Sequence, residues 1–516
     1  MALNRRRTRL FCGTLSAAAA LGAACAASAR DYYLDAAGGS DAAPATRTAP
    51  WKSLARVNAT TFAPGDRILL KSGGVWTGQL FPKGSGAADA WITLDRYGAG
   101  SKPLLRSENA AEPVVLQGQQ FWTIQNLAVV GGNRGVLIGS NGILSPQVLH
   151  GIHLRGLDVS GAAGDRTGDH AGIHLIPSTA AMDDVRIENC FVHAVNTEGI
   201  WLENLNSSLC THVTLRGNRI DGTHGNGIVV NSTETPLVED NVVYRCGAVN
   251  TDAGQAVGGL FPFKCHGGVF QHNEVAYTAR SVDGYGFDLD EGCSGTFLYQ
   301  YNYSHDNWGG FFEDTVHSLD GLADRCFLRD NISLNDGAGD PATHDTGKNA
   351  WGLFRLTGKH LTVYNNVFSS DRLPLYVQQW YNPQGAAEFL NNIFWCPNGF
   401  HSEADDHLAG SNPFVYDHNL FWGANGPADG THQLNRVNPR FVRPGPVTDG
   451  FRALRGYRLQ AHSPCRRAGR TITNNGGRDF FGNSLPLRSP DIGAAQFPFS
   501  PDPLRAGRGA GETAWR

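Results

Sequence analysis

The chain lacks most features of disordered, helical-bundle, membrane-spanning or nucleic-acid-binding proteins. Charged residues make up only 17% of its 516 residues and glycine occurs 64 times, which fits a turn-rich β protein. The formal net charge is −4, so no bulk nucleic-acid binding is indicated. Beyond the N-terminal region no apolar run is long enough to span a bilayer. We therefore expect no nucleic-acid partner and no stable membrane insertion.

Closely spaced cysteine pairs are also missing. Eight cysteines follow the N-terminal region without a CxxC motif: Cys190, Cys210, Cys246, Cys265, Cys293, Cys326, Cys396 and Cys465. A cysteine metal cluster is therefore not expected. Two alternatives stay open. Some cysteines pair, with Cys265 and Cys293 the plausible pair because both follow the same strand of adjacent repeats, or they lie buried as small apolar residues.

The N-terminus has the pattern of an export signal. Four arginines between positions 5 and 9 precede an apolar stretch from Leu10 to Ala27, and Ala27-Ser28-Ala29 supplies a small-x-small cleavage site before Arg30. This pattern predicts a signal peptide over residues 1–29 and a secreted or periplasmic protein.

An asparagine recurs inside nearly the same short frame, as in LRGNRI, VEDNVV and FLNNIF. The asparagines are Asn218, Asn241, Asn273, Asn302, Asn331, Asn366, Asn392 and Asn419, with steps of 23, 32, 29, 29, 35, 26 and 27 residues. A period in this range marks a solenoid. The frames are too short for paired helices, so β strands are favoured. We expect the amides to stack from coil to coil, with Leu127, Leu157 and Cys190 holding the same column in earlier coils.

These repeats predict an all-β fold, a single-stranded right-handed parallel β-helix with N- and C-terminal caps. The ranges are a cap and first coils over 30–120, the β-helix over 121–430, a C-terminal cap over 431–497 and a disordered tail over 498–516. A C-terminal cap is expected because an open last coil would expose an unpaired edge.

The chain resembles the right-handed parallel β-helix superfamily, which includes pectate lyases and polygalacturonases. The resemblance rests on the coil frames, the asparagine ladder, and the segments PWKSL, PGDRILLKSG and DFFGNSLPLRSPDIGA. It implies action on an extracellular polysaccharide, by hydrolase or lyase chemistry, in a groove along one sheet. We accordingly expect a polysaccharide substrate and a monomer.

A second strand in each coil begins with glycine, as in GIHLIP, GIWLEN, GFDLDE and GFFEDT. When the glycines are aligned, the residue after each glycine is predicted to point inward, and strand alternation then points the following residue outward. The outward positions then include several aromatic residues: Trp201, Phe261, Phe263, Phe312, Phe354 and Tyr376. An exposed aromatic strip indicates either a sugar-stacking groove or a surface covered by loops. The insertions 161–169 and 249–256 would wall such a groove.

Acidic residues converge on this strip. Asp288, Asp290 and Glu291 belong to one coil, and Asp314 is placed outward in the next. Neighbouring strands lie ~4.8 Å apart and same-face residues ~6.8 Å apart. Asp290 beside Asp314 would suit a retaining glycosidase at ~5 Å, and Asp288 with Asp290 an inverting one at ~6.5–9.5 Å. Because crowded carboxylates repel, one pKa should rise and supply a general acid.

Three alternatives for this cluster stay open: a glycosidase centre, a calcium site of Asp288, Asp290, Glu291 and Asp314, and a solvated acidic face. The hydrolase needs no cofactor, whereas a lyase would use Ca²⁺. Lys264 is the best candidate for the lyase's base, or else forms a salt bridge to Glu291. One pectate-lyase family has a lysine where this chain has Asp288, and that difference favours hydrolysis.

Other side chains are expected to support catalysis or bind sugar. The alignment points Glu313 and Arg355 inward as a buried pair, but a bulge in the strand would make both line the site. Trp201 would stack on sugar, and Glu198 and Glu203 would bind its hydroxyls. The remaining expected substrate-binding residues are His174, His224, Phe261, Phe312, Arg355 and Tyr376. We therefore favour a glycoside hydrolase, with a calcium-assisted uronate lyase and a non-catalytic carbohydrate-binding solenoid as alternatives.

Overall fold

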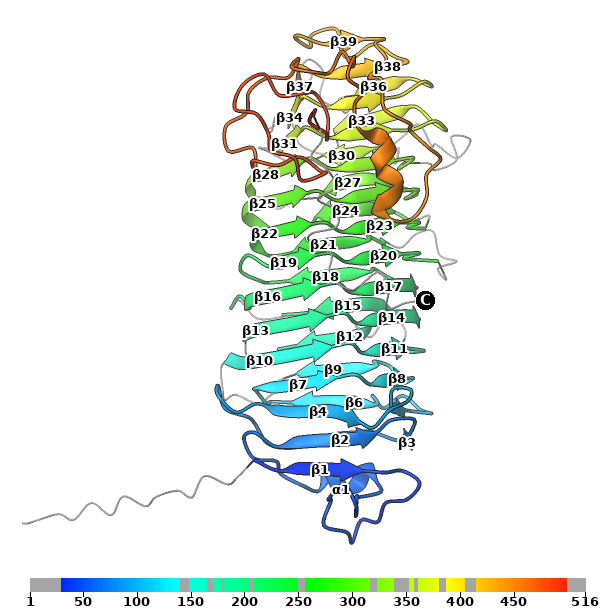
Figure 1. Cartoon of the computed structure of the whole chain (residues 1–516), viewed down its shortest axis with the longest axis vertical. Helices are drawn as coiled ribbons and strands as arrows, with labels where there is room; N and C mark the ends of the chain where they lie inside the picture. The colour runs from blue at the N-terminus through cyan, green and yellow to red at the C-terminus, as the bar shows by residue number, and fades with distance from the viewer. Residues whose placement is uncertain are drawn as a thin grey trace, which may run out of the picture.

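A computed structural model describes most of the chain. The described residues are 29–139, 148–164, 170–177, 181–204, 208–248, 256–279, 281–315, 323–337, 352–356, 361–379, 387–403 and 414–498. They form a long solenoid of three parallel sheets, and each full coil adds one strand to each sheet in turn (Figure 1). The fold class is confirmed. The predicted signal peptide lies outside the described residues, as does the predicted tail apart from its first residue.

Sheet 1 has 14 strands. They are β1 (Asp31–Leu34), β2 (Arg67–Lys71), β4 (Ile92–Tyr97), β7 (Trp122–Gln125), β10 (Val148–Arg155), β13 (Ala181–Glu188), β16 (Thr211–Arg216), β19 (Leu237–Glu239), β22 (His266–Gln271), β25 (Ser294–Gln300), β28 (Ala323–Arg329), β31 (Leu361–Tyr364), β34 (Ala387–Leu390) and β37 (Phe414–Asp417). Parallel pairing already begins between β1 and β2. The segment before residue 121 therefore forms coils of its own, with the short helix α1 (Leu54–Asn58) beside β1 at the N-terminal end (Figure 1).

Sheet 2 also has 14 strands. They are β3 (Val75–Thr77), β5 (Leu104–Arg106), β8 (Ala128–Val130), β11 (Asp158–Ser160), β14 (Phe191–Val195), β17 (Arg219–Thr223), β20 (Val242–Tyr244), β23 (Glu274–Ala276), β26 (Tyr303–His305), β29 (Ile332–Leu334), β32 (Val367–Ser369), β35 (Ile393–Trp395), β38 (Leu420–Trp422) and β39 (Leu434–Asn435).

Sheet 3 has 11 strands. They are β6 (Val114–Gln117), β9 (Val136–Gly139), β12 (Ala171–Ile176), β15 (Glu198–Leu202), β18 (Ile228–Asn231), β21 (Leu260–Phe263), β24 (Tyr285–Leu289), β27 (Gly310–Asp314), β30 (Phe354–Leu356), β33 (Leu375–Gln379) and β36 (Phe400–Glu403). This is the sheet built from the glycine-led strands.

The asparagine ladder occupies the turn between sheets 1 and 2. In its interior, Nδ2 of Asn302 donates to Oδ1 of Asn331 at 3.1 Å, and Oδ1 of Asn302 accepts from Nδ2 of Asn273 at the same distance. The same amide-to-amide contact links every neighbouring pair from Asn218 to Asn419. The ladder residues are fully buried, so these bonds satisfy polar groups that would otherwise lack partners. The predicted stacking is confirmed.

The C-terminal segment runs back along the outside of sheet 2 (Figure 1). The 3-10 helix η3 (Phe451–Tyr457) belongs to a second apolar core, separate from the solenoid interior. In that core the segment covers outward side chains of sheet 2 such as Tyr303 and Ile332. The segment thus packs along the flank of the solenoid.

All eight cysteines after the N-terminal region are buried and free. The suggested Cys265–Cys293 disulfide is therefore wrong, and the alternative of buried apolar thiols holds. Within the described part of the chain, none of the helices has the length and apolarity needed to cross a bilayer.

Candidate active site

The outer face of sheet 3 carries one continuous column of side chains. The strand pairing aligns His174, Trp201, Val229, Phe261, Asp288, Glu313, Arg355 and Gln378 in this column. From His174 to Asp288 the column agrees with the alignment by glycines. From β27 onward it differs, because Glu313 rather than Phe312 lies beside Asp288.

A bulge at the start of β27 causes this difference. The backbone N–H groups of Phe311 and Phe312 both donate to the carbonyl oxygen of Leu353, at 3.1 and 3.2 Å. Two residues thus face one partner position, which resets the inward–outward alternation. Gly310 permits the close approach, since a Cβ there would overlap the carbonyl oxygen of Gly352.

The bulge corrects three predicted placements. Phe312 and Phe354 are fully buried in the solenoid core and cannot stack on substrate. Asp314 pairs in register with Leu289 and Leu356, in an inward column, and is only 3% exposed. Glu313 and Arg355 lie in the outward column, so of the two alternatives for this pair the bulged strand holds and the inward placement is wrong. The alternation failed here because adjacent phenylalanines satisfy the apolar pattern in either register.

Three aspartates lie on or next to β24. Asp288 is buried and one of its carboxylate oxygens has no hydrogen-bond partner among the described residues. Asp290 is partly exposed and accepts from the Thr315 hydroxyl at 2.9 Å and from the Glu291 backbone N–H at 2.7 Å. Asp283, also partly exposed, lies just before the strand and was missed from the sequence. The sequence feature that could have identified Asp283 is its position beside Gly284, in the turn just before an acidic strand.

Arg355 connects Asp283 to Glu313. Its Nη2 donates to Oδ1 of Asp283 at 2.6 Å and forms an ion pair with Glu313, while Nη1 donates to the Val282 carbonyl at 3.3 Å. Arg355 is 3% exposed and Glu313 is fully buried. Glu313 is thus a buried carboxylate that depends on one guanidinium for its countercharge, and the same guanidinium orients Asp283.

Burial and mutual repulsion shift the acidity of this cluster. Burial, reinforced by the charges of Asp290 and Asp283, raises the pKa of Asp288 well above its usual value, and Arg355 offsets only part of this. Burial also raises the pKa of Asp290, although hydrogen bonds from Glu291 and Thr315 oppose the shift. The cluster thus combines two carboxyl groups whose pKa values are raised with Asp283, which accepts a hydrogen bond from a guanidinium. Carboxyl groups in different environments are what acid–base catalysis by two carboxylates requires.

Glu291 contacts the cluster through its backbone N–H, which donates to Asp290. Lys264 is exposed, with its ammonium group 4.8 Å from the ring centre of Phe263. Among the described residues a backbone hydrogen bond of 2.9 Å, from Lys264 N–H to the Glu291 carbonyl, joins the two but no ion pair does, so the suggested salt bridge is wrong. Asp314 faces inward, so the four residues of the suggested calcium site do not share one face of the sheet.

A second polar group lies farther along the column. Nε2 of His174 lies 3.0 Å from Oε2 of Glu203, and Nδ1 accepts from Nε of Arg134 at 3.0 Å. The Trp201 ring stacks on His174 at 4.8 Å, inclined by 8°. The Trp201 indole N–H has no hydrogen-bond partner within the described residues. Trp201 and Asp288 are three strand spacings apart in sheet 3, roughly 14 Å, so this group does not touch the aspartates.

The other expected substrate-binding residues are scattered. Glu198 accepts from the backbone N–H of Asn226, and His224 lies 2.8 Å from the Asn196 side-chain oxygen. Phe261 belongs to the outward column but is only 7% exposed. Tyr376 stacks on His401 at 4.6 Å. Most of the two insertions expected to wall the groove lies outside the described residues.

Comparisons with known proteins agree with this architecture. Residues 114–318 match the family model described as the right handed beta helix region. A lacto-N-biosidase of Bifidobacterium longum subsp. longum is 25% identical over 599 residues, covering 90% of this chain but 36% of that protein. This chain thus spans about a third of the relative's length. Native and selenomethionine crystal structures of GH136 lacto-N-biosidase from Eubacterium ramulus superpose with TM-scores of 0.57 and 0.56, each at 22% identity over 71% of this chain and 68% of theirs. The family model and the three parallel sheets together show that the chain folds as a right-handed parallel β-helix.

Proposed function

We propose that this chain is a secreted glycoside hydrolase that cleaves a carbohydrate chain lying along the outer face of sheet 3. The observation that carries the proposal is the group of aspartates around Arg355. Asp283 and Asp290 reach solvent there, whereas Asp288 and Glu313 lie too deep to touch a sugar. The curated lacto-N-biosidase relative supports hydrolysis over elimination.

The two accessible carboxyl groups take different roles in this proposal. Asp290, whose pKa is raised by burial, protonates the oxygen of the leaving sugar. Asp283, oriented by its hydrogen bond from Arg355, attacks the anomeric carbon or activates a water molecule. Asp288 and Glu313 fix the charge and position of this pair. Trp201, whose ring rests on the buried His174, binds a sugar several units away.

The test compares Asp283→Asn and Asp290→Asn with Glu291→Gln on a panel of glycans. Loss of a general acid or a nucleophile should lower kcat about 10²–10⁴-fold, whereas exposed Glu291 donates only its backbone N–H to the cluster. New reducing ends without absorbance in the unsaturated-uronate band indicate hydrolysis, and with that absorbance elimination. Near-native activity in both aspartate variants would refute this site.

Export is a separate part of the proposal. It rests on the arginine-led apolar N-terminus and the Ala27-Ser28-Ala29 site. N-terminal sequencing of protein recovered from the medium or periplasm should begin at Arg30. Recovery of the full chain from the cytosol alone would contradict it.

A further inference from the structure

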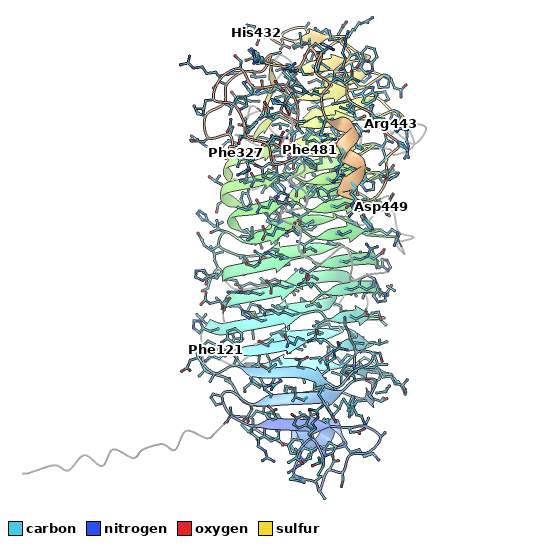
Figure 2. The ribbon with its side chains drawn as sticks, in the orientation of Figure 1. Phe121, Phe327, His432, Arg443, Asp449 and Phe481 are labelled. Carbon is cyan, nitrogen blue, oxygen red and sulfur yellow. The ribbon has the colours of Figure 1, made fainter. Side chains whose placement is uncertain are left out.

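A group of metal-binding side chains lies on the outer face of sheet 2, apart from the sheet 3 aspartates. Glu274 begins β23, His305 ends β26, and Asp449 comes from the C-terminal segment just before η3 (Figure 2). Each offers one donor atom, and the three atoms lie within 4.8 Å of one another. Side chains from two coils and a distant segment therefore converge on one point.

The spacing of the donor atoms suits ligands that share an ion. Nε2 of His305 lies 3.4 Å from Oε1 of Glu274 and 4.0 Å from Oδ1 of Asp449. Tetrahedral ligands at ~2.0–2.1 Å from zinc are separated by about 3.4 Å. Both distances exceed those of good N–H···O hydrogen bonds.

Neighbouring side chains hold the three donors in place. Nδ1 of His305 lies 3.0 Å from Oδ2 of Asp306, which turns Nε2 toward Glu274. The hydroxyls of Tyr244 and Tyr277 donate to Glu274 and Asp449, each at 2.5 Å. A carboxylate on the far nitrogen of a histidine is the usual outer support of a metal-bound imidazole.

The net negative charge of the group can be balanced by a dication. Glu274, Asp306 and Asp449 supply three carboxylates, and Arg372 pairs with Asp306 at 2.7 Å. With His305 neutral, a dication and Arg372 together balance the three carboxylates. With His305 protonated and no metal ion, one negative charge stays unbalanced. Because Glu274 is 2% exposed and His305 fully buried, an unbalanced charge would be poorly solvated.

We propose that Glu274, His305 and Asp449 bind one divalent transition-metal ion, zinc by their chemistry, which ties the C-terminal segment to the solenoid. One imidazole nitrogen with carboxylate oxygens suits zinc, whereas Ca²⁺ and Mg²⁺ prefer oxygen ligands alone. The Asp449 side chain is 53% exposed, which gives the ion a path from solvent.

The experiment titrates ZnCl₂ into the EDTA-treated, dialysed full chain by calorimetry at pH 8, with CaCl₂ and MgCl₂ alongside. We expect one zinc per chain, tighter than calcium or magnesium and accompanied by a rise in Tm. Asp449→Asn and His305→Gln should weaken zinc binding by at least ~10-fold. Asp449→Asn changes a half-exposed side chain, so a circular-dichroism spectrum matching the native one keeps the test valid if His305→Gln fails to fold.

The matched control is His432→Ala. It removes a ligand from the other three-donor group of the described residues, Asp417, His418 and His432, near the C-terminal end of the solenoid (Figure 2). This variant should keep the high-affinity zinc. The proposal is overturned if the native chain binds no zinc, if Asp449→Asn binds it equally well, or if His432→Ala abolishes binding.

Discussion

Arg355→Met removes the cation that serves both a buried carboxylate and an accessible one. Methionine fills much of the same space but leaves Glu313, which is fully buried, without a countercharge. Breaking a buried pair by removing one partner costs about 3–5 kcal/mol. The free energy of unfolding, measured by urea titration with tryptophan fluorescence, should fall by that amount.

The companion variant Arg355→Met/Glu313→Gln separates stability from activity. Glutamine removes the stranded charge, so the double variant should regain at least about 2 kcal/mol over Arg355→Met. Asp283 still lacks the 2.6 Å hydrogen bond from Nη2 in both variants. Misplacing a reacting group by about 1 Å costs roughly 10²-fold in rate, so kcat/KM should stay low in both.

Two results would refute this reasoning. If the double variant is no more stable than Arg355→Met, Glu313 is not the group that Arg355 neutralises. If the double variant regains activity, Asp283 does not depend on Arg355. The urea m-value should stay unchanged across the three proteins, so that a shift in midpoint reports stability.

Three further predictions address the ladder, a buried acid and the distal aromatic group. Asn302→Ala removes four side-chain hydrogen bonds and should lower the free energy of unfolding in urea by about 2–6 kcal/mol. Asn218→Ala, at the start of the ladder, removes three and should cost less. Equal losses in the two variants would contradict a cooperative ladder. Asp330 is fully buried, and burial raises its pKa well above the usual value. The contribution of Asp330 to stability is therefore present below its pKa in the unfolded chain and lost as pH rises through its pKa in the folded chain. In thermal scans the Tm of Asp330→Asn should exceed that of the native chain at pH 8 but not at pH 3. Trp201→Ala should raise KM for glycan about 3–10-fold with little change in kcat, and an unchanged KM would place the bound sugar elsewhere.

The fold could be predicted because its signal repeats. Each coil supplies a buried asparagine at one turn and an apolar residue at the same inward position, so errors in one coil are corrected by its neighbours. The ladder from Asn218 to Asn419 and its apolar continuation through Leu127, Leu157 and Cys190 follow from this repetition, and all of these residues lie buried as expected.

The site could be predicted only in part, because it lies where the repetition breaks. Asp288 and Asp290 were found from their spacing on a strand. The bulge beside Phe311 exchanged the faces of Glu313 and Asp314, and no sequence period reports a single added residue when both neighbours are apolar. Asp283 precedes its strand, where alternation gives no orientation at all.

The break in register explains why the charged residues gather at this point of sheet 3. On an unbulged strand Glu313 and Arg355 would enter the apolar interior together, away from Asp283. The bulge turns both outward next to Asp288, so the ion pair can reach Asp283 across three successive strands. A buried pair of this kind adds little stability of its own, and replacing it with apolar residues would be tolerated by the fold. Its position therefore fits a group retained for the chemistry of the neighbouring aspartates, since buried charges of this cost are found mainly at functional sites.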